Sequence, residues 1–158
     1  MRLLVISDSH GKSGVIDRIL LSQPKALNVF FLGDKVEDIE DMIYLYPERN
    51  FYIVSGNCDF FSSYKSFDFV KLGKHKILFT HGHTFGVKYG SVSALKKAAS
   101  QNGCDIVLYG HTHIANTEYE NGLYIVNPGS CSCSREGSNS YAVIDLLDNG
   151  ILPQIIEI

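Results

Sequence analysis

Six short apolar runs in this chain each end in a cluster of polar residues, and this repeat constrains the fold more than any other feature. The clusters are DSH (8–10), GDK (33–35), GNCD (56–59), HGH (81–83), GHTH (110–113) and NPGS (127–130). They hold five of the six histidines, together with Asp8, Asp34 and Asn57. Short runs of β-branched and aromatic residues that are apolar nearly throughout are typical of strands buried on both faces. The sequence therefore predicts buried strands that end at polar side chains.

The remaining segments complete an α/β pattern. The six strands are expected at 2–7, 28–32, 51–55, 76–80, 105–109 and 123–127, with further strands at 67–71, 117–120, 141–145 and 154–158. Amphipathic periodicity predicts helices at 12–23, 36–46 and 91–101, which stop near Pro24, Pro47 and Gly103. Two packed sheets flanked by helices would accommodate a first half that alternates strand and helix and a second half that is mostly strand.

Composition limits the organisation and the partners. The chain has 158 residues with no linker, low-complexity tract or fixed repeat, so we expect one domain over 1–158. A net charge of −3 without a long basic run argues against nucleic acid or an acidic membrane as the main partner. The first apolar run is too short for a signal-peptide core or a membrane span. Together with four cysteines that form no disulfide framework, this predicts a cytoplasmic protein.

The spacing inside the clusters indicates that their side chains converge. Three pairs of ligand-type residues are two positions apart, namely Asp8 and His10, His81 and His83, and His111 and His113. In extended backbone both members of such a pair point to the same side. Each cluster alone is also compatible with a capped turn or solvated histidines. Their joint occurrence at the ends of successive strands, where open α/β sheets bind ligands, predicts a dinuclear metal site.

The ordered motifs resemble those of the calcineurin-like metallophosphoesterase superfamily, and most of all its small bacterial and archaeal branch of minimal phosphodiesterases. The resemblance covers nearly the whole chain. It implies a four-layer α/β/β/α sandwich with two mixed sheets, the metallo-dependent phosphatase fold. It also implies that Asp8, His10, Asp34 and His113 hold one divalent metal, and that Asp34, Asn57, His81 and His111 hold the second. Asp34 would then bridge the two ions.

A site of this kind accounts for phosphoester hydrolysis. Two divalent ions attract a phosphate oxygen and lower the pKa of bound water towards ~7, which supplies a hydroxide nucleophile at neutral pH. The resemblance to the small branch implies, more narrowly, a phosphodiesterase acting on a small phosphorylated substrate. Carboxylate, amide and imidazole ligands together suit Mn²⁺, Ni²⁺, Fe²⁺ or Zn²⁺ better than Ca²⁺, and Mn²⁺ is the first expectation.

The motifs do not supply an obvious general acid to protonate the leaving group of the ester. Many larger superfamily members have histidine directly after the motif asparagine, whereas this chain has Cys58, as the small branch commonly does. A thiol with a reference pKa of ~8.5 is a poor general acid, so activated diesters should be favoured. Asn57 is a catalytic candidate, and so is His83 as a substrate contact or proton donor, with a supporting or solvated role equally open. Asp59 and Asn127 are expected to orient the metal-binding loops.

Several alternatives stay open at this point. The same site could serve a phosphomonoesterase, a protein phosphatase or a nuclease, and the retromer subunit of this fold is a non-catalytic scaffold. Cys131 and Cys133 offer a less favoured soft-metal pair. Lys35, beside Glu37 and Asp38, is expected in a surface ion pair rather than on phosphate. Exposed aromatics at Phe60, Phe61 and Tyr64 would allow self-association or stacking on a leaving group.

Overall fold

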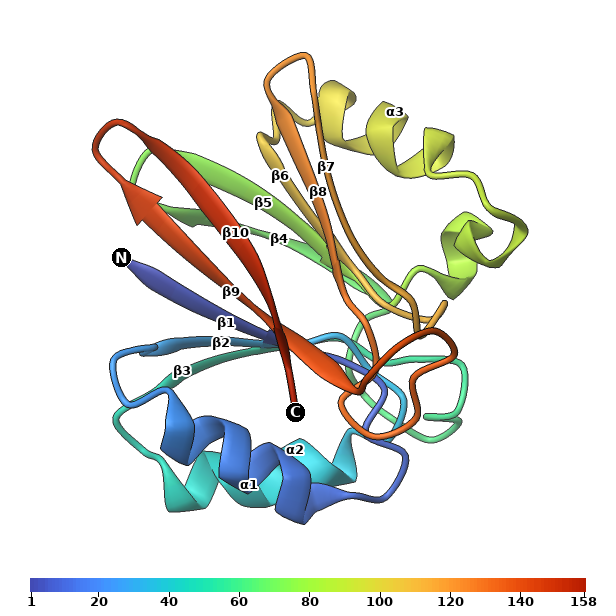
Figure 1. Cartoon of the computed structure of the whole chain (residues 1–158). Helices are drawn as coiled ribbons and strands as arrows, with labels where there is room; N and C mark the ends of the chain where they lie inside the picture. Colours follow the sequence, from blue (N-terminus) through green and yellow to red (C-terminus); the bar gives the residue numbers. More distant parts are fainter.

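A computed structural model describes all residues from 1 to 158, and two five-stranded sheets stacked face to face form its centre (Figure 1). The first sheet has the order β10-β9-β1-β2-β3 and the second the order β4-β5-β6-β8-β7. The strands of the first sheet are β1 (Arg2–Ile6), β2 (Asn28–Phe31), β3 (Asn50–Ile53), β9 (Ser140–Leu147) and β10 (Gly150–Glu157). Those of the second are β4 (Phe67–Leu72), β5 (His75–Thr80), β6 (Ile106–Tyr109), β7 (Ala115–Glu120) and β8 (Leu123–Pro128).

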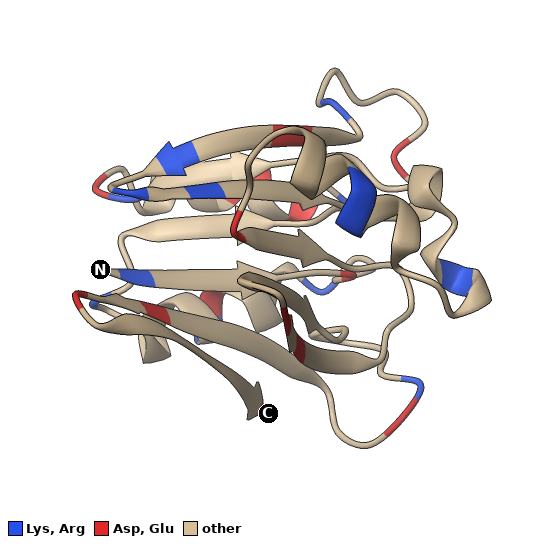
Figure 2. Cartoon of the chain, turned by 90° about the horizontal axis from the view of Figure 1, so that it is seen from above, with Lys and Arg blue, Asp and Glu red and all other residues tan.

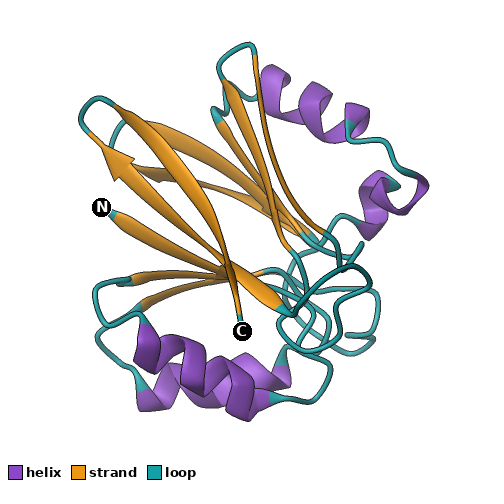
Figure 3. Ribbon diagram, viewed as in Figure 1, coloured by secondary structure: helices purple, strands orange, loops and turns teal.

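Both sheets are mixed, as predicted. In the first, β1, β2 and β3 are parallel, while β9 and β10 continue the sheet antiparallel beside β1. In the second, β5, β6 and β8 are parallel, and β4 and β7 pair antiparallel at the two edges. The carboxyl ends of both parallel sets reach the same end of the molecule, where Figure 3 shows most of the long loops gathered together.

Helices cover the outer face of each sheet and give the predicted α/β/β/α order. The helices α1 (Ser13–Ser22) and α2 (Glu37–Leu45) pack on the first sheet, and α3 (Ser93–Gln101) packs on the second (Figure 1). Two short 3₁₀ turns, η1 (His83–Phe85) and η2 (Val87–Tyr89), precede α3. The predicted helices at 12–23, 36–46 and 91–101 are confirmed, with ends shifted by one or two residues.

Successive side chains of the central strands point to opposite faces of the sheet and so contribute to two separate apolar layers. In β1, Leu3 and Val5 face the second sheet, whereas Leu4 and Ile6 face α1 and α2, and all four are fully buried. Under α3, Leu95 and Ala99 form the third layer with β5, β6 and β8. Because full burial of a large aliphatic side chain contributes roughly 1.5–3 kcal/mol, β1 anchors both layers that it touches. It thereby fixes the loop that follows it.

Three of the expected strands differ from the structure. The strand expected at 51–55 ends at Ile53 and is half-buried rather than buried on both faces, because β3 is the edge strand of its sheet. The two last strands are longer than expected and form one hairpin. The sequence did not indicate the full length of β10 because it contains Pro153, and proline within a run argues against a central strand. β10 lies at the edge of its sheet, where proline is tolerated.

The surface carries both signs of charge. Basic and acidic residues are scattered over the sheets and helices, and no element presents a continuous basic stripe (Figure 2). None of the helices combines the length and the apolar character that a membrane crossing requires.

Candidate metal centre

Left-handed backbone turns, rather than extended segments, bring the polar clusters together. Positive φ angles occur at Asp8 (57°), His10 (46°), Asp34 (59°), His111 (71°) and His113 (60°). Such angles are uncommon outside glycine and concentrate at functional sites. The expectation that the paired residues point to one side from extended backbone is therefore wrong for Asp8 with His10 and for His111 with His113. The chain must turn back over the sheet ends at these positions.

The structure brings the seven expected ligand residues into one region. Ligand atoms of Asp8, His10, Asp34 and His113 lie within 4.8 Å of one another, and so do those of Asp34, His81 and His111. The Oδ1 atom of Asn57 lies 3.2 Å from Nε2 of His81, which places this amide beside the second group. Asp34 belongs to both groups. Each group draws on loops from both sheets.

Asp8 carries the clearest sign that the site fits a cation. Its side chain is fully buried, and its Oδ2 accepts hydrogen bonds from Ser7 Oγ at 2.6 Å and from the His111 backbone N–H at 3.1 Å. Its Oδ1 accepts no hydrogen bond, although Nε2 of His113 lies 3.2 Å from it. A buried carboxylate oxygen without a partner is costly, and a bound metal would satisfy it. Burial acts to raise the pKa of Asp8, but His113, His81 and Ser7 together hold that pKa below its usual value.

Backbone carbonyls orient two of the histidines. Nδ1 of His81 donates to the Leu32 carbonyl at 2.7 Å, and Nδ1 of His113 donates to the Cys133 carbonyl at 2.7 Å. These bonds leave Nε2 of each ring as a lone-pair donor that faces the centre. Burial, with the neighbouring His81, lowers the pKa of His111 to about 4, so this ring is neutral at neutral pH. Neutral imidazole is the form that binds metals.

Asp59 ties two loops of the site together. Its Oδ2 accepts from the backbone N–H groups of Asp34 at 3.0 Å and Gly56 at 2.7 Å. Its Oδ1 accepts from the backbone N–H groups of Lys35 at 2.8 Å and Val36 at 3.0 Å. One carboxylate therefore satisfies four backbone donors, and this pattern fits the orienting role expected for Asp59.

The same two loops touch through glycine. Gly33 has a φ of 93°, and a side chain on it would overlap the backbone of Gly56. A methyl group on Gly56 would overlap Oδ1 and the backbone nitrogen of Asp34. Only glycine therefore allows the loops to approach closely enough to hold Asp34 in both ligand groups.

Asn127 braces the loop that carries His111 and His113. Its Nδ2 donates to the Gly110 carbonyl at 3.1 Å and to Thr112 Oγ1 at 3.0 Å, and its Oδ1 accepts from the Gly129 backbone at 2.9 Å. It is fully buried. These contacts fit the loop-positioning role expected from the sequence.

The sequence reasoning missed three further supports. Asp38 Oδ2 accepts from Ser9 Oγ at 2.7 Å and from the Gly11 backbone at 2.8 Å. Asp38 is thus a buried anchor rather than a partner of Lys35, and the ion pair expected for Lys35 is with Glu37 at 3.4 Å. Ser130 and Ser132 donate to the backbone carbonyls of residues 8 and 9. An acidic residue at the start of a helix is ordinary in sequence, so nothing local revealed the partner of Asp38.

Cys58 and His83 border the ligand groups. The Cys58 backbone N–H donates to Asp34 Oδ1 at 2.9 Å, and its thiol lies 3.4 Å from Asp34 Oδ2. Burial, followed by the charge of Asp34, raises the pKa of Cys58 to about 11, so the thiol is neutral. The ring of His83 lies 5.3 Å from that of His81, and its Nδ1 is buried without a partner. Burial and His81 lower the pKa of His83.

The structure also decides several smaller expectations. Cys131 is fully buried in the apolar layer under α1 and α2 whereas Cys133 is exposed, so the two do not form a soft-metal pair. Phe60 and Phe61 are exposed at 84% and 103%, but Tyr64 is half-buried against the core, contrary to the expectation. The sixth histidine, His75, lies outside all six clusters and is buried with its Nδ1 2.5 Å from Asp105.

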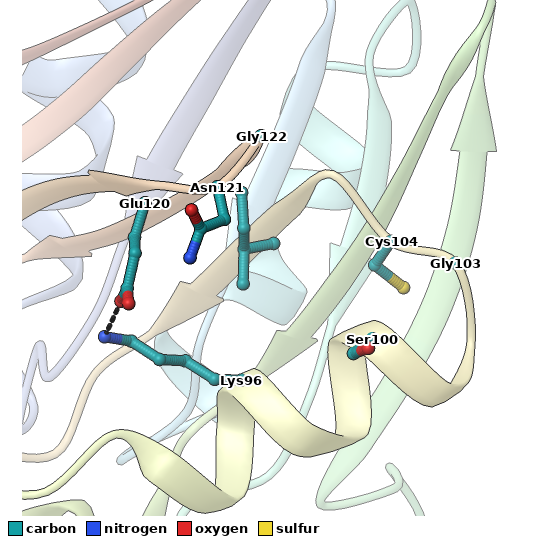
Figure 4. Close-up of a pocket in the computed structure, with 8 residues that line it drawn as sticks. Lys96, Ser100, Gly103, Cys104, Glu120, Asn121 and Gly122 are labelled. Carbon is teal, nitrogen blue, oxygen red and sulfur yellow. Dashed lines mark hydrogen bonds and ion pairs between the residues drawn. The ribbon is translucent and has the colours of Figure 1, made fainter.

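A separate hollow of about 390 Å³ lies at the opposite end of the second sheet, between α3 and the turn joining β7 to β8 (Figure 4). Its one basic group, Lys96, is paired with Glu120 and lies 3.7 Å from Glu118. Burial raises the pKa of Cys104, so its thiol is neutral. This hollow offers no cluster of reactive groups, and the chemistry of the molecule lies at the other end of the sheets.

The fold and the two ligand groups that share Asp34 define a metallophosphoesterase, a hydrolase of phosphoester bonds. Residues 1–149 match the calcineurin-like phosphoesterase superfamily domain, and the chain belongs to this superfamily. It is 34% identical over 149 residues to the probable metallophosphoesterase YsnB of Bacillus subtilis. The aligned region covers 92% of this chain and 85% of YsnB. It is 29% identical to the phosphodiesterase YfcE of Escherichia coli K12, over 98% of this chain and 91% of YfcE.

A solved structure supports the same assignment. The crystal structure of a conserved uncharacterized protein of Streptococcus pneumoniae, a predicted phosphoesterase, superposes with a TM-score of 0.84 at 28% identity. The match covers 99% of this chain and 88% of that protein. The four-layer fold expected from the resemblance is thereby confirmed.

Proposed function

We propose that this chain is a phosphodiesterase that hydrolyses small phosphodiesters at a centre of two divalent ions. The observation that carries the proposal is the position of Asp34, which contributes to both groups of ligand atoms and so can bridge two ions. The unpartnered Oδ1 of Asp8 supports it, since a buried carboxylate oxygen calls for a cation.

The proposed ligands form two sets, one for each ion, that share Asp34. Asp8, His10, Asp34 and His113 would hold one ion, and Asp34, Asn57, His81 and His111 would hold the other. When bound, such ions supply an activated water and stabilise the charge that develops on phosphate oxygens. The mixed oxygen and nitrogen donor set favours Mn²⁺ as the first ion to assay, with Ni²⁺, Fe²⁺ or Zn²⁺ as alternatives.

The protein groups around the centre favour reactive diesters. The neutral thiol of Cys58 is turned towards Asp34, and a pKa of about 11 makes it a poor proton donor to a leaving group. His83 is the proposed substrate contact or proton donor because its ring borders the second group of ligand atoms, 5.3 Å from the ring of His81. Asn57 is proposed to ligate through Oδ1, while its Nδ2, which donates one hydrogen to Cys58 Sγ at 3.5 Å, has a second hydrogen for a phosphate oxygen.

The proposed substrate is a small molecule rather than a nucleic acid or a membrane lipid. The net charge is −3, and charged residues of both signs are scattered along the chain without a basic stripe (Figure 2). We also infer a cytoplasmic location, in which reducing conditions keep the four free cysteines as thiols.

The proposal is tested by metal-dependent hydrolysis of chromogenic esters. With added Mn²⁺, we expect bis(para-nitrophenyl) phosphate to be hydrolysed with a higher kcat/KM than para-nitrophenyl phosphate, and we expect EDTA to abolish both activities. A faster reaction with the monoester or with phosphopeptides would identify a phosphatase instead. Bound metal without hydrolysis of either ester class would point to a scaffold and overturn the enzyme assignment.

A further inference from the structure

A second hollow of about 390 Å³ adjoins the candidate metal centre, between the start of α2 and the turn that follows β3. Its walls include Lys35, Glu37 and Glu40 on one side and Cys58, Phe60 and Phe61 on the other. Cys58 joins the hollow to the centre because its backbone N–H donates to Asp34 Oδ1 at 2.9 Å. A substrate whose phosphate lies at the metals therefore has this space beside it.

The apolar part of the hollow consists of two exposed phenylalanines. Phe60 and Phe61 are exposed at 84% and 103%, although their neighbour Tyr64 packs against the core. Aromatic rings gain free energy when another ring stacks on them or meets them edge to face, and water offers no such contact. Two adjacent exposed rings beside a catalytic centre are therefore a suitable surface for an aromatic group.

The charged part of the hollow disfavours an additional anion. Glu37 and Glu40 line the wall, and the ammonium group of Lys35 is 3.4 Å from Glu37 and so partly neutralised. The carboxylate of Asp59 is occupied by four backbone N–H groups. The side chains that line the hollow therefore carry more negative than positive charge, and the nearby carboxylates oppose a substituent that carries a carboxylate or a further phosphate.

We infer that this hollow receives an uncharged aromatic ester group of the substrate while the phosphate is held at the metal centre. The inference rests on the proposed function and narrows the substrate class to phosphodiesters with at least one neutral planar ester group. The volume lies within the range of roughly 300–1,000 Å³ that is usual for small-molecule sites.

The test compares two ligands that share a head group. Dissociation constants for methylphosphonate and phenylphosphonate are measured by calorimetry on the full chain loaded with Mn²⁺. We expect phenylphosphonate to bind about threefold to tenfold more tightly, as aromatic contacts of this kind allow. In the double variant Phe60→Ala, Phe61→Ala the two dissociation constants should become about equal, because both rings are then absent. Neither ring is buried, so circular dichroism should confirm that this variant folds.

A matched control removes an exposed aromatic elsewhere. Tyr119 is 64% exposed on β7, outside the hollow, and Tyr119→Ala should keep the preference for phenylphosphonate. A carboxylate in the para position of the phenyl ring should weaken binding, and Glu40→Gln should restore part of the loss. Sedimentation of wild type and the double variant should be the same, since a change in oligomeric state would instead place the two rings at a contact between copies and overturn the inference.

The outcomes separate the inference from the function on which it rests. Equal affinity of the wild type for the two phosphonates would overturn the aromatic site and leave the metal centre intact. Loss of the preference in Tyr119→Ala as well would also count against it, because the effect would not be local. If neither phosphonate binds to the loaded protein, both the inference and the proposed phosphate site fail.

Discussion

Asp34 lies where the loops after β2 and β3 touch, and its surroundings leave little room for change. Its Oδ1 accepts from the Cys58 backbone, and its own backbone N–H donates to Asp59. Gly56 approaches so closely that any side chain there would overlap the carboxylate. Three residues that are not proposed ligands, Cys58, Asp59 and Gly56, thus fix the position of the Asp34 carboxylate.

This crowding predicts a large effect from the smallest substitution. Gly56→Ala should displace the Asp34 carboxylate, lower the free energy of unfolding by about 1–3 kcal/mol, and weaken Mn²⁺ binding, since overpacking forces the backbone to move. Urea unfolding and metal titration measure the two effects.

The matched control is Gly14→Ala in α1, where an added methyl group meets nothing within 4 Å. Because alanine is a better helix former than glycine, this change should raise stability by up to ~1 kcal/mol and leave metal binding unchanged. If Gly56→Ala has the same stability and the same Mn²⁺ affinity as the wild type, the result contradicts the crowding around Asp34.

Ligand residues could be predicted from the sequence more readily than the residues that hold them. Asp8, Asp34 and His81 follow apolar runs directly, so their place at strand ends was visible. Asp38 accepts hydrogen bonds from the loop after β1, and no local pattern indicates a partner so distant in sequence. The left-handed turns at Asp8 and His10 were equally hidden, because neither residue type requires a positive φ.

At the scale of elements, β1 is held from both sides, and its contact with β9 includes an ion pair. Arg2 Nε donates to Asp145 Oδ1 at 2.9 Å and Arg2 Nη2 donates to Oδ2 at 2.7 Å. The hydrogen bonds from Arg2 lower the pKa of Asp145 below its ordinary value of 3.8. A carboxyl whose pKa is depressed in the folded state stabilises the fold above its unfolded pKa, and this contribution is lost as the pH falls through the folded pKa.

Lowering the pH should therefore reduce the difference in Tm between wild type and Arg2→Gln. At neutral pH the variant should have the lower Tm, and the two Tm values should approach each other as the pH falls below about 4, near the ordinary pKa of an aspartate. Thermal unfolding monitored by circular dichroism from neutral pH down to about pH 2 measures the convergence, because the contribution of Asp145 is lost only below the ordinary aspartate pKa of about 3.9. A Tm difference that stays constant down to the acid limit would show that the ion pair does not act through Asp145.

Elements at the centre of the sheets were easier to predict than those at the edges. Strands such as β1 and β6 are apolar on both faces, so their sequence signal is continuous. The edge strands β3 and β10 are only partly buried, and β10 contains proline, so their sequence signal is weaker and their bounds were wrong.

At the scale of the whole molecule, the candidate centre joins the two sheets. One ligand group combines the loops after β1 and β2 with His113 from the loop after β6, and the other combines Asp34 with His81 and His111 from the second sheet. The stacking of the sheets, which no local pattern specifies, determines these distances. The sequence predicted that the clusters converge at one end, and the packing of Leu3 and Val5 against the second sheet provides the physical means.

The claim that Asp34 bridges two ions is tested most directly by the Mn²⁺ stoichiometry and the electron paramagnetic resonance spectrum of wild type and Asp34→Asn. Asparagine keeps the size of the side chain but removes the charge and one ligand oxygen. We predict two Mn²⁺ per wild-type chain with a spin-coupled spectrum, and in Asp34→Asn a loss of the coupling, weaker binding and loss of diester hydrolysis. A single ion in the wild type, or a coupled pair with full activity in Asp34→Asn, would contradict the account.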